Sequence, residues 1–256
     1  MNLSELFMRL PAPIRRHVRK YLARTPLQYA LPTGIHIEVE DRCDWAIYND
    51  VFVCGEYDEA IESALAACPA GRPLRIVDLG ANVGFFLLRS LHRARLRQRD
   101  AQIEGLVLEG SPSTFRKLVA RTSRQPGLAG IQFVNRLVGQ RAGHGHIDGA
   151  ENSAGAQVGS GAARGERVEY LDLENAFDDW QAVDLVKCDI EGSEETLIRT
   201  YPAWLGRIRQ LVIEIHPMYC DSAFVKGAIH EAGLELQTEV VGPHGGQTCF
   251  FRRPTR

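Results

Sequence analysis

Carboxylate, amide and histidine side chains follow several apolar runs of this chain, at positions where each run is expected to end as a strand. Asp78 is followed by Gly80, Asn82 and Gly84, and Glu109 stands at the end of the next apolar run. An apolar strand that enters a glycine-rich turn and then a helix is typical of a site for a nucleoside-containing cofactor. A carboxylate at the tip of the neighbouring strand is suited to accept hydrogen bonds from two ribose hydroxyls.

The pattern D-x-G-x-N-x-G at positions 78–84 discriminates between cofactors. A dinucleotide site has G-x-G-x-x-G, whose glycines let the backbone approach a pyrophosphate at a helix N-terminus. A fixed Asp78 would repel a pyrophosphate, but it suits a ligand that carries an ammonium and a sulfonium group. The turn therefore favours S-adenosylmethionine over NAD. Taken alone, the same turn is also compatible with an ordinary connection between a strand and a helix.

Four ionisable residues stand near the ends of two later apolar runs, VDLVKCDIEGSEE and LVIEIHP. Residues two apart in a strand share a face, so Lys187 and Asp189 are expected to point the same way. The same spacing places Glu214 and His216 on one face. Charged groups inside apolar strands are costly unless they are paired. We therefore expect a structural ion pair of Lys187 with Glu191 or Glu214, whereas for Asp189 and His216 a functional role is favoured over a core one.

Alternating apolar runs and amphipathic stretches predict the elements that position these residues. Strands are expected at Arg75–Leu79, Gly105–Glu109, Ile131–Val134, Asp184–Asp189 and Leu211–His216. Helices are expected near 57–68, 84–97, 112–123, 193–201 and 222–232, and a strand or hairpin within 36–53. Residues 234–241 and 247–252 should form a closing antiparallel pair. Strands that alternate with helices predict an α/β fold, a parallel sheet with helices on both faces.

The 256 residues are expected to form one α/β domain over residues 31–256, preceded by a helical extension at 1–30. The extension has an apolar stripe and a basic face, a pattern compatible with a membrane surface but more typical of packing on the domain or on a partner in a homodimer. The glycine-rich segment 143–167 has few large apolar residues, which predicts a long flexible loop, either a lid or an insertion.

Composition excludes several classes of function. A net charge of −2 gives no general attraction to nucleic acid. No apolar stretch reaches the roughly 18 residues of a membrane span, and no apolar leader precedes a cleavage site. The six cysteines are dispersed without a C-x-x-C pair, as expected for reduced thiols. These features predict a cytoplasmic protein that does not act on nucleic acid and is not stably inserted into a membrane.

Several motifs together resemble one known family. DLGANVGFF, LEGSPSTFRKL, VNRLVGQRAG, DLVKCDIEGSEETLI and LVIEIHP occur in this order, preceded by GEY at 55–57. Over residues 44–217 the chain resembles the FkbM-type S-adenosylmethionine-dependent methyltransferases. The resemblance implies the Rossmann-like class I methyltransferase fold, with a seven-stranded, mostly parallel sheet and an antiparallel last strand. It also implies methyl transfer to hydroxyl groups of sugars, polyketides and similar metabolites.

The resemblance implies which residues bind the cofactor. It implies that Asp78, Gly80, Asn82 and Gly84 hold the methionine part and that Glu109 binds the ribose. It places Gly110, Ser111 and Asn135 beside the adenosine. Asp189 and Ile190 would lie next to the methyl group, with Glu56 and Tyr57 as a cover. The family usually has proline where this chain has Gly110, and often asparagine where it has Arg121.

An aliphatic hydroxyl needs a base when it attacks a methyl group, and His216 is the first candidate because an ordinary imidazole titrates near neutrality. Asp189 is the second candidate. Glu214 would orient His216 or form a hard-metal site with Asp189 and Glu191. The family motif requires no metal, so none is expected. Three other functions remain as alternatives: a nicotinamide oxidoreductase, a nucleic-acid or protein N-methyltransferase, and a non-catalytic scaffold that only binds the cofactor.

Overall fold

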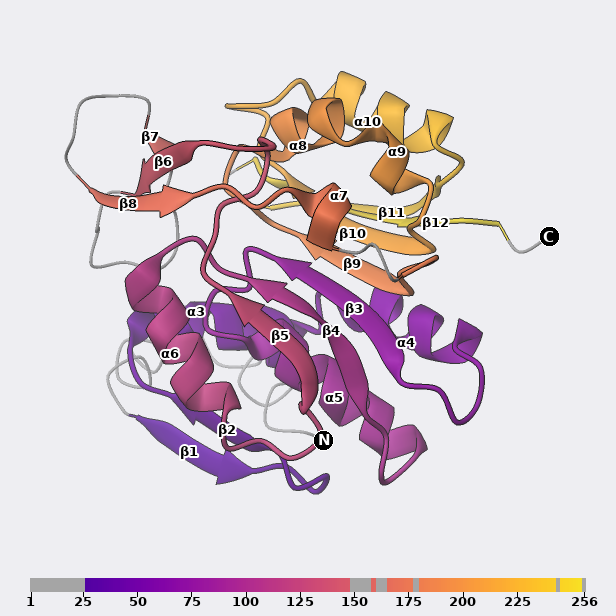
Figure 1. Ribbon diagram of the computed structural model, residues 1–256. Helices are drawn as coiled ribbons and strands as arrows, with labels where there is room; N and C mark the ends of the chain where they lie inside the picture. Colours follow the sequence, from indigo (N-terminus) through magenta and orange to yellow (C-terminus); the bar gives the residue numbers. More distant parts are fainter. Residues whose placement is uncertain (1–25, 148–157, 160–164, 177–179, 243–244, 255–256) are drawn as a thin grey trace, which may run out of the picture.

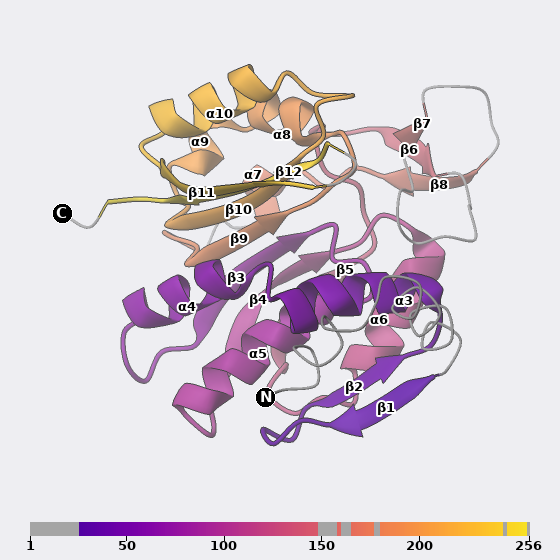
Figure 2. The ribbon, with the colours of Figure 1, turned by 180° about the vertical axis from the view of Figure 1, so that it is seen from behind.

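The computed structural model describes residues 26–147, 158–159, 165–176, 180–242 and 245–254. Its centre is a seven-stranded sheet with the order β11-β12-β10-β9-β3-β4-β5 (Figures 1 and 2). The strands are β3 (Leu74–Leu79), β4 (Ile103–Leu108), β5 (Gly130–Val134), β9 (Leu185–Cys188), β10 (Gln210–Ile215), β11 (Glu235–Val241) and β12 (Gln247–Arg252). Only β12 runs antiparallel to its two neighbours, β10 and β11. The sheet confirms the predicted Rossmann-like α/β fold.

Helices cover both faces of this sheet, and each face has its own apolar core (Figure 2). One layer consists of α4 (Asp58–Ala67), α5 (Phe85–Arg97) and α6 (Pro112–Thr122). The other consists of α7 (Leu173–Ala176), α8 (Glu194–Thr200), α9 (Pro202–Leu205) and α10 (Ser222–Glu231). The central strands β3, β4, β9 and β10 are buried along most of their length because side chains of both faces meet a helical layer.

The segment expected to be a strand or hairpin within 36–53 is a strand only at its start. β1 (Leu27–Ala30) pairs with β2 (His36–Val39), after which the chain forms α3 (Arg42–Tyr48) and a π-helical segment, η1 (Asn49–Cys54). The helix begins there because the carboxylate of Asp41 accepts the backbone N–H groups of Cys43 and Asp44. This capping outweighs the alternation of apolar and polar residues, on which the prediction of a strand or hairpin rests.

Arg121, where the resembled family often has asparagine, forms a buried ion pair between two helices. Its guanidinium lies 2.6 Å from the carboxylate of Asp44 on α3 and donates a hydrogen bond to the carbonyl oxygen of Val83. Both side chains are almost completely buried. The arginine therefore connects α6 to α3 and to the turn after β3. An asparagine side chain would be too short to make both contacts.

The predicted flexible loop at 143–167 is ordered into short strands at its two ends. β6 (His144–Ile147) pairs antiparallel with β8 (Glu166–Glu169) and with β7 (Val158–Gly159) in a separate small sheet. Residues 148–157 and 160–164 lie outside the described residues, and so do residues 1–25, which contain the expected basic helix. Nothing in the described ranges forms a helix that is both long and apolar enough to cross a membrane.

Candidate functional site

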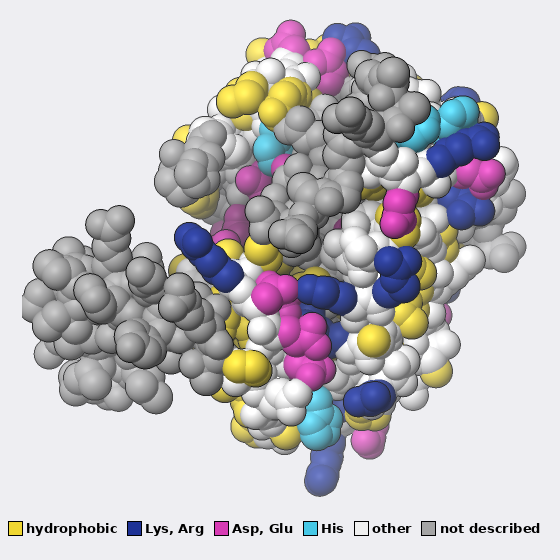
Figure 3. Space-filling model, turned by 90° about the vertical axis from the view of Figure 1, so that its left-hand side faces the viewer, with side chains coloured by type: hydrophobic (Ala, Val, Ile, Leu, Met, Phe, Trp, Pro, Cys, Tyr) yellow, Lys and Arg dark blue, Asp and Glu magenta, His cyan; other side chains and the backbone are white. Residues whose placement is uncertain are grey.

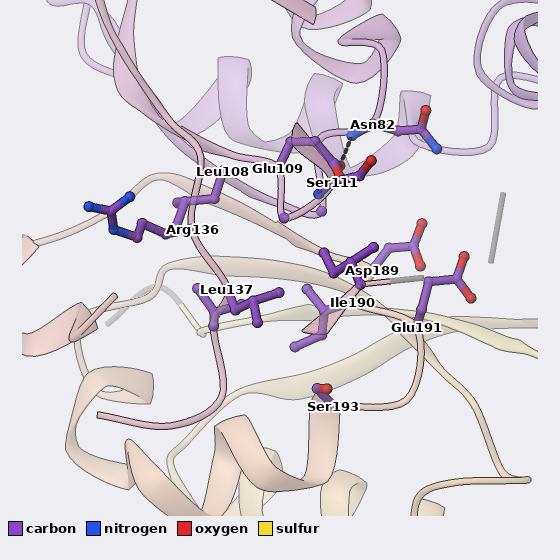
Figure 4. Close-up of a pocket in the computed structure, with 14 residues that line it drawn as sticks. Asn82, Leu108, Glu109, Ser111, Arg136, Leu137, Asp189, Ile190, Glu191 and Ser193 are labelled. Atoms are coloured by element: carbon purple, nitrogen blue, oxygen red, sulfur yellow. Dashed lines mark hydrogen bonds between the residues drawn. The ribbon is translucent and has the colours of Figure 1, made fainter. Parts of the chain in front are cut away.

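A pocket lies at the edge of the sheet where four adjacent parallel strands end (Figure 4). Residues at or after the ends of β3, β4, β5 and β9 line it, together with Ile147 of β6: Gly80, Asn82, Leu108, Glu109, Gly110, Ser111, Arg136, Leu137, Val138, Asp189, Ile190, Glu191 and Ser193. Ligands of open α/β sheets bind at this carboxyl edge. The pocket is therefore the primary site candidate.

The carboxylate of Glu109 is held by two backbone N–H groups. The N–H of Asn82 donates to Oε2 at 2.8 Å (dashed in Figure 4), and the N–H of Ser111 donates to Oε1 at 2.7 Å. Burial raises the pKa of Glu109, although these two hydrogen bonds oppose the shift. Each oxygen keeps a further lone pair, so the fixed carboxylate is able to accept hydrogen bonds from a vicinal diol.

Gly80 allows two strand ends to approach closely. A Cβ atom at this position would lie 1.8 Å from the carbonyl oxygen of Asp189, and the φ angle of Gly80 is +75°. Only glycine combines this contact with a left-handed backbone. The turn after β3 is therefore packed directly against the end of β9, which fixes the floor of the pocket.

Lys187 is buried between the ends of β3 and β9 and is an ion-pairing residue, as expected. Its partners differ from the expected Glu191 or Glu214, because β9 pairs with β3 in a register that places Lys187 beside Asp78. Its ammonium lies 3.6 Å from Asp78 and 3.5 Å from Asp189, and it donates a 2.6 Å hydrogen bond to the carbonyl oxygen of Gly80.

These contacts set the charge states beneath the pocket. Burial would lower the pKa of Lys187, but the carboxylates of Asp189 and Asp78 outweigh it and raise the pKa. Burial raises the pKa of Asp78 to about 6, against the opposing attraction of Lys187. Asp78 is fully buried and is not among the pocket-lining residues, so in this arrangement it supports the turn from below.

A second group of ionisable side chains adjoins the pocket at the ends of β9 and β10. His216 Nδ1 lies 3.1 Å from Oε1 of the fully buried Glu194, while Nε2 lies 3.5 Å from Glu191 and 3.8 Å from Glu214. The shared face expected for Glu214 and His216 is confirmed. Figure 3, which looks onto the edge where the parallel strands end, shows acidic side chains next to a histidine in its upper half.

The hydrogen bond that His216 Nδ1 donates to the carboxylate of Glu194 raises the pKa of His216 to about 9, and burial opposes the shift only in part. Burial and the neighbouring Asp189 raise the pKa of Glu214 to about 7. The same two causes, burial and Asp189, raise the pKa of Glu191. In this arrangement His216 is protonated at neutral pH, so it becomes a proton acceptor only after that proton is displaced.

Among the described residues, one group has the donor types and spacing to hold a metal ion. One ligand atom each of Asp189, Glu214 and His216 lie within 4.8 Å of one another. The hard-metal set considered from the sequence contained Glu191 in place of His216. Glu191 lies beside this group and also lines the pocket.

The remaining predicted cofactor residues fall into two groups. Gly80, Asn82, Glu109, Gly110, Ser111, Asp189 and Ile190 line the pocket, whereas Asp78, Gly84, Asn135, Glu56 and Tyr57 do not. The Asn135 amide donates to the carbonyl oxygens of Glu109 and Gly110, at 2.8 and 2.9 Å, so it fixes the loop after β4. Gly84 caps α5.

Glu56 and Tyr57 lie near the ionisable side chains at the ends of β9 and β10 and do not form part of the pocket wall. The carboxylate of Glu56 accepts a hydrogen bond from the Thr248 hydroxyl at 2.7 Å. Tyr57 packs edge-on against Phe86. Burial raises the pKa of both residues, and Asp189 adds to the shift in each case.

Several residues of the site were not foreseen from the sequence. Glu194, the last residue of the motif K-x-D-x-E-G-x-E, contacts His216 across 22 positions, and the motif was the only available signal. Leu137 follows β5 and Ile147 lies on β6, and both side chains form part of the pocket wall. Ile147 carried no signal because the composition of its glycine-rich segment predicts a loop.

No protein-family model and no curated protein matches this chain. Among solved structures, an O-methyltransferase family protein from Burkholderia thailandensis aligns with a TM-score of 0.48 and 12% identity, over 83% of this chain and 59% of that one. A human methyltransferase 10 domain containing protein aligns with a TM-score of 0.48 and 12% identity, over 77% of this chain and 80% of that one. The METTL16 MTase domain aligns with a TM-score of 0.47 and 11% identity, over 78% of this chain and 82% of that one. Likenesses at this level concern the fold alone, so function must be inferred from the residues of this chain.

Proposed function

We propose that the chain is an S-adenosylmethionine-dependent methyltransferase that methylates a hydroxyl group of a small metabolite, such as a sugar or a polyketide. The proposal also takes up the FkbM-type resemblance of the motifs at 78–84, 109–118 and 187–194. The observation that carries it is the carboxylate of Glu109, held by two N–H groups at the wall of a pocket whose floor is Gly80.

The residues present fit this cofactor. Glu109 offers acceptor lone pairs for a ribose diol, and the described residues that line the pocket include no lysine and a single arginine, Arg136. Leu137, Ile147 and Ile190 supply an apolar surface for a base. Asp189 and Glu191 supply negative charge on the side nearest His216, which suits a cationic sulfonium rather than a pyrophosphate.

When bound, S-adenosylmethionine supplies a methyl group that is activated by its sulfonium. The protein has to align the acceptor oxygen with that group and to remove the hydroxyl proton. Asp189 lines the pocket and lies beside Glu214 and His216, and this group is the candidate acceptor of that proton. Glu194 holds His216 through Nδ1, so that Nε2 faces the carboxylates.

Calorimetric titration of the purified chain with S-adenosylhomocysteine and, separately, with NAD tests the proposal. We expect saturable binding of S-adenosylhomocysteine and none of NAD. Binding of NAD alone would overturn the proposal in favour of an oxidoreductase. Binding of neither ligand would overturn the assignment of the cofactor.

Replacing His216 by alanine is expected to lower turnover by about 100-fold or more, with the affinity for S-adenosylhomocysteine kept. Turnover should fall because His216 contacts the carboxylates beside the pocket. The affinity should be kept because His216 does not itself line the pocket. Turnover is measured as S-adenosylhomocysteine formed on whichever sugar or polyketide acceptor the wild type methylates. His230→Ala, at the exposed end of α10, is the matched control. Equal turnover in the two variants would remove His216 from the mechanism.

A further inference from the structure

The carboxylates at the ends of β9 and β10 outnumber the cationic side chains that contact them. Among the described residues, two cations, Lys187 and His216, face five carboxylates: Asp78, Asp189, Glu191, Glu194 and Glu214. Lys187 is already shared between two of these carboxylates and the carbonyl oxygen of Gly80. Unpaired negative charge in a partly buried site is costly, so the arrangement is suited to an additional cation.

The donor atoms have the spacing of a common coordination sphere. Metal–ligand distances of about 2.0–2.2 Å place two donors of one ion roughly 3 to 4.4 Å apart. His216 Nε2 and Glu214 Oε1 are 3.8 Å apart, and the group with Asp189 lies within 4.8 Å. Side-chain rotations that move the donor atoms by a few tenths of an ångström are therefore sufficient to bring all three donors onto one ion.

Two observations outside this spacing also point to a ligand. Oδ1 of Asp189 is buried and has no hydrogen-bond partner among the described residues, although the side chain as a whole is 25% exposed. The second is the buried Glu194, which holds His216 at Nδ1 and leaves Nε2 beside the carboxylates of Glu191 and Glu214. A carboxylate that fixes the far nitrogen of a histidine is the usual outer partner of a metal-binding imidazole.

We propose that Asp189, Glu214 and His216 bind a divalent transition-metal ion such as Mn²⁺, with Glu194 as the residue that positions His216. Imidazole favours transition metals and carboxylates favour hard cations, and Mn²⁺ accepts both donor types. Three protein ligands leave coordination positions for an acceptor oxygen. The binding of the ion stands on these residues alone, whereas its role toward an acceptor hydroxyl rests on the proposed function.

The upward pKa shifts of Glu214 and Glu191 agree with this assignment, because both reflect carboxylates crowded by like charge as well as by burial. A bound cation would remove that repulsion. The same ion would take the place of the proton at Nε2 of His216, since an imidazole nitrogen that binds a metal carries no proton.

Titration of the metal-stripped full chain with Mn²⁺, followed by the loss of the free-ion electron paramagnetic resonance signal, tests the proposal. We expect binding of a single ion per chain, weakened at least about 10- to 100-fold in each of Asp189→Asn, Glu214→Gln and His216→Ala. Glu194→Gln should weaken it by a similar factor through His216. Far-UV circular dichroism and thermal unfolding show that each variant is folded before it is titrated.

His230→Ala and Glu231→Gln, two exposed positions at the end of α10, are the matched controls and should bind Mn²⁺ like the wild type. Absence of saturable binding in the folded wild type would overturn the metal site, as would binding that persists unchanged in the three ligand variants. Titration with S-adenosylhomocysteine on the same samples separates the two proposals. A chain that binds this ligand but no Mn²⁺ keeps the proposed function and loses the metal site.

Discussion

Glu109→Ala is expected to weaken the binding of S-adenosylhomocysteine roughly 100-fold. Two hydrogen bonds from a ribose diol to a charged acceptor contribute about 3 kcal/mol or more, which corresponds to this factor in Kd. The substitution also leaves the N–H groups of Asn82 and Ser111 without their present acceptor, so the turn after β3 loses a support. Isothermal titration calorimetry on wild type and variant measures the change directly.

Glu104→Ala is the matched control for this variant. Glu104 lies on the same strand, β4, but near its opposite end, where it pairs with Arg75 across to β3. Its removal should leave the affinity for S-adenosylhomocysteine unchanged while costing about as much stability as an ordinary surface pair. If Glu109→Ala bound the ligand as tightly as Glu104→Ala does, the cofactor site would not be where we place it.

Lys187→Met is expected to destabilise the fold by about 3–5 kcal/mol. The methionine keeps much of the side-chain volume, but it leaves Asp78 and Asp189 without their cation, and one buried partner of an ion pair cannot be removed cheaply. The carbonyl oxygen of Gly80 loses its donor as well. Urea denaturation followed by circular dichroism gives the free energy of unfolding for both proteins.

Lys226→Met provides the comparison. Lys226 pairs with Glu239 at 2.6 Å in a part-exposed position, where an ion pair contributes about 1 kcal/mol or less. The double variant Lys187→Met with Asp78→Asn should recover part of the loss, since it removes the buried carboxylate together with its cation. A loss for Lys187→Met no larger than for Lys226→Met would contradict the buried network.

The central sheet could be predicted from the sequence because its signals are local. The apolar runs, the glycines of the turn and the Ser111–Pro112 helix start each act within a few residues, and the strand ends differ from expectation by one or two positions. The prediction of a strand or hairpin within residues 36–53 was wrong beyond Val39, because a single side chain, Asp41, caps a helix there. β6 and β8 could not be recognised, because each owes its order to the other across a glycine-rich interval.

The site was predictable to the extent that it depends on strand ends. Asp189 and Glu109 stand at the tips of strands, so their place at the pocket followed from periodicity. The partners of Lys187 did not follow, because they depend on which strand lies beside β9 and in what register. Glu194 stayed unassigned for a similar reason: it meets His216 only when α8 packs over the end of β10.

The place of β12 has a consequence for how the chain is made. β10 pairs with β12 along its whole length on one side, and β11 reaches the sheet only through β12. Until residues 247–252 have been synthesised, the apolar strand β10 therefore has an open edge that other nascent chains could pair with. A released chain truncated before residue 247 should therefore need chaperone protection, whereas the released chain that includes β12 should not.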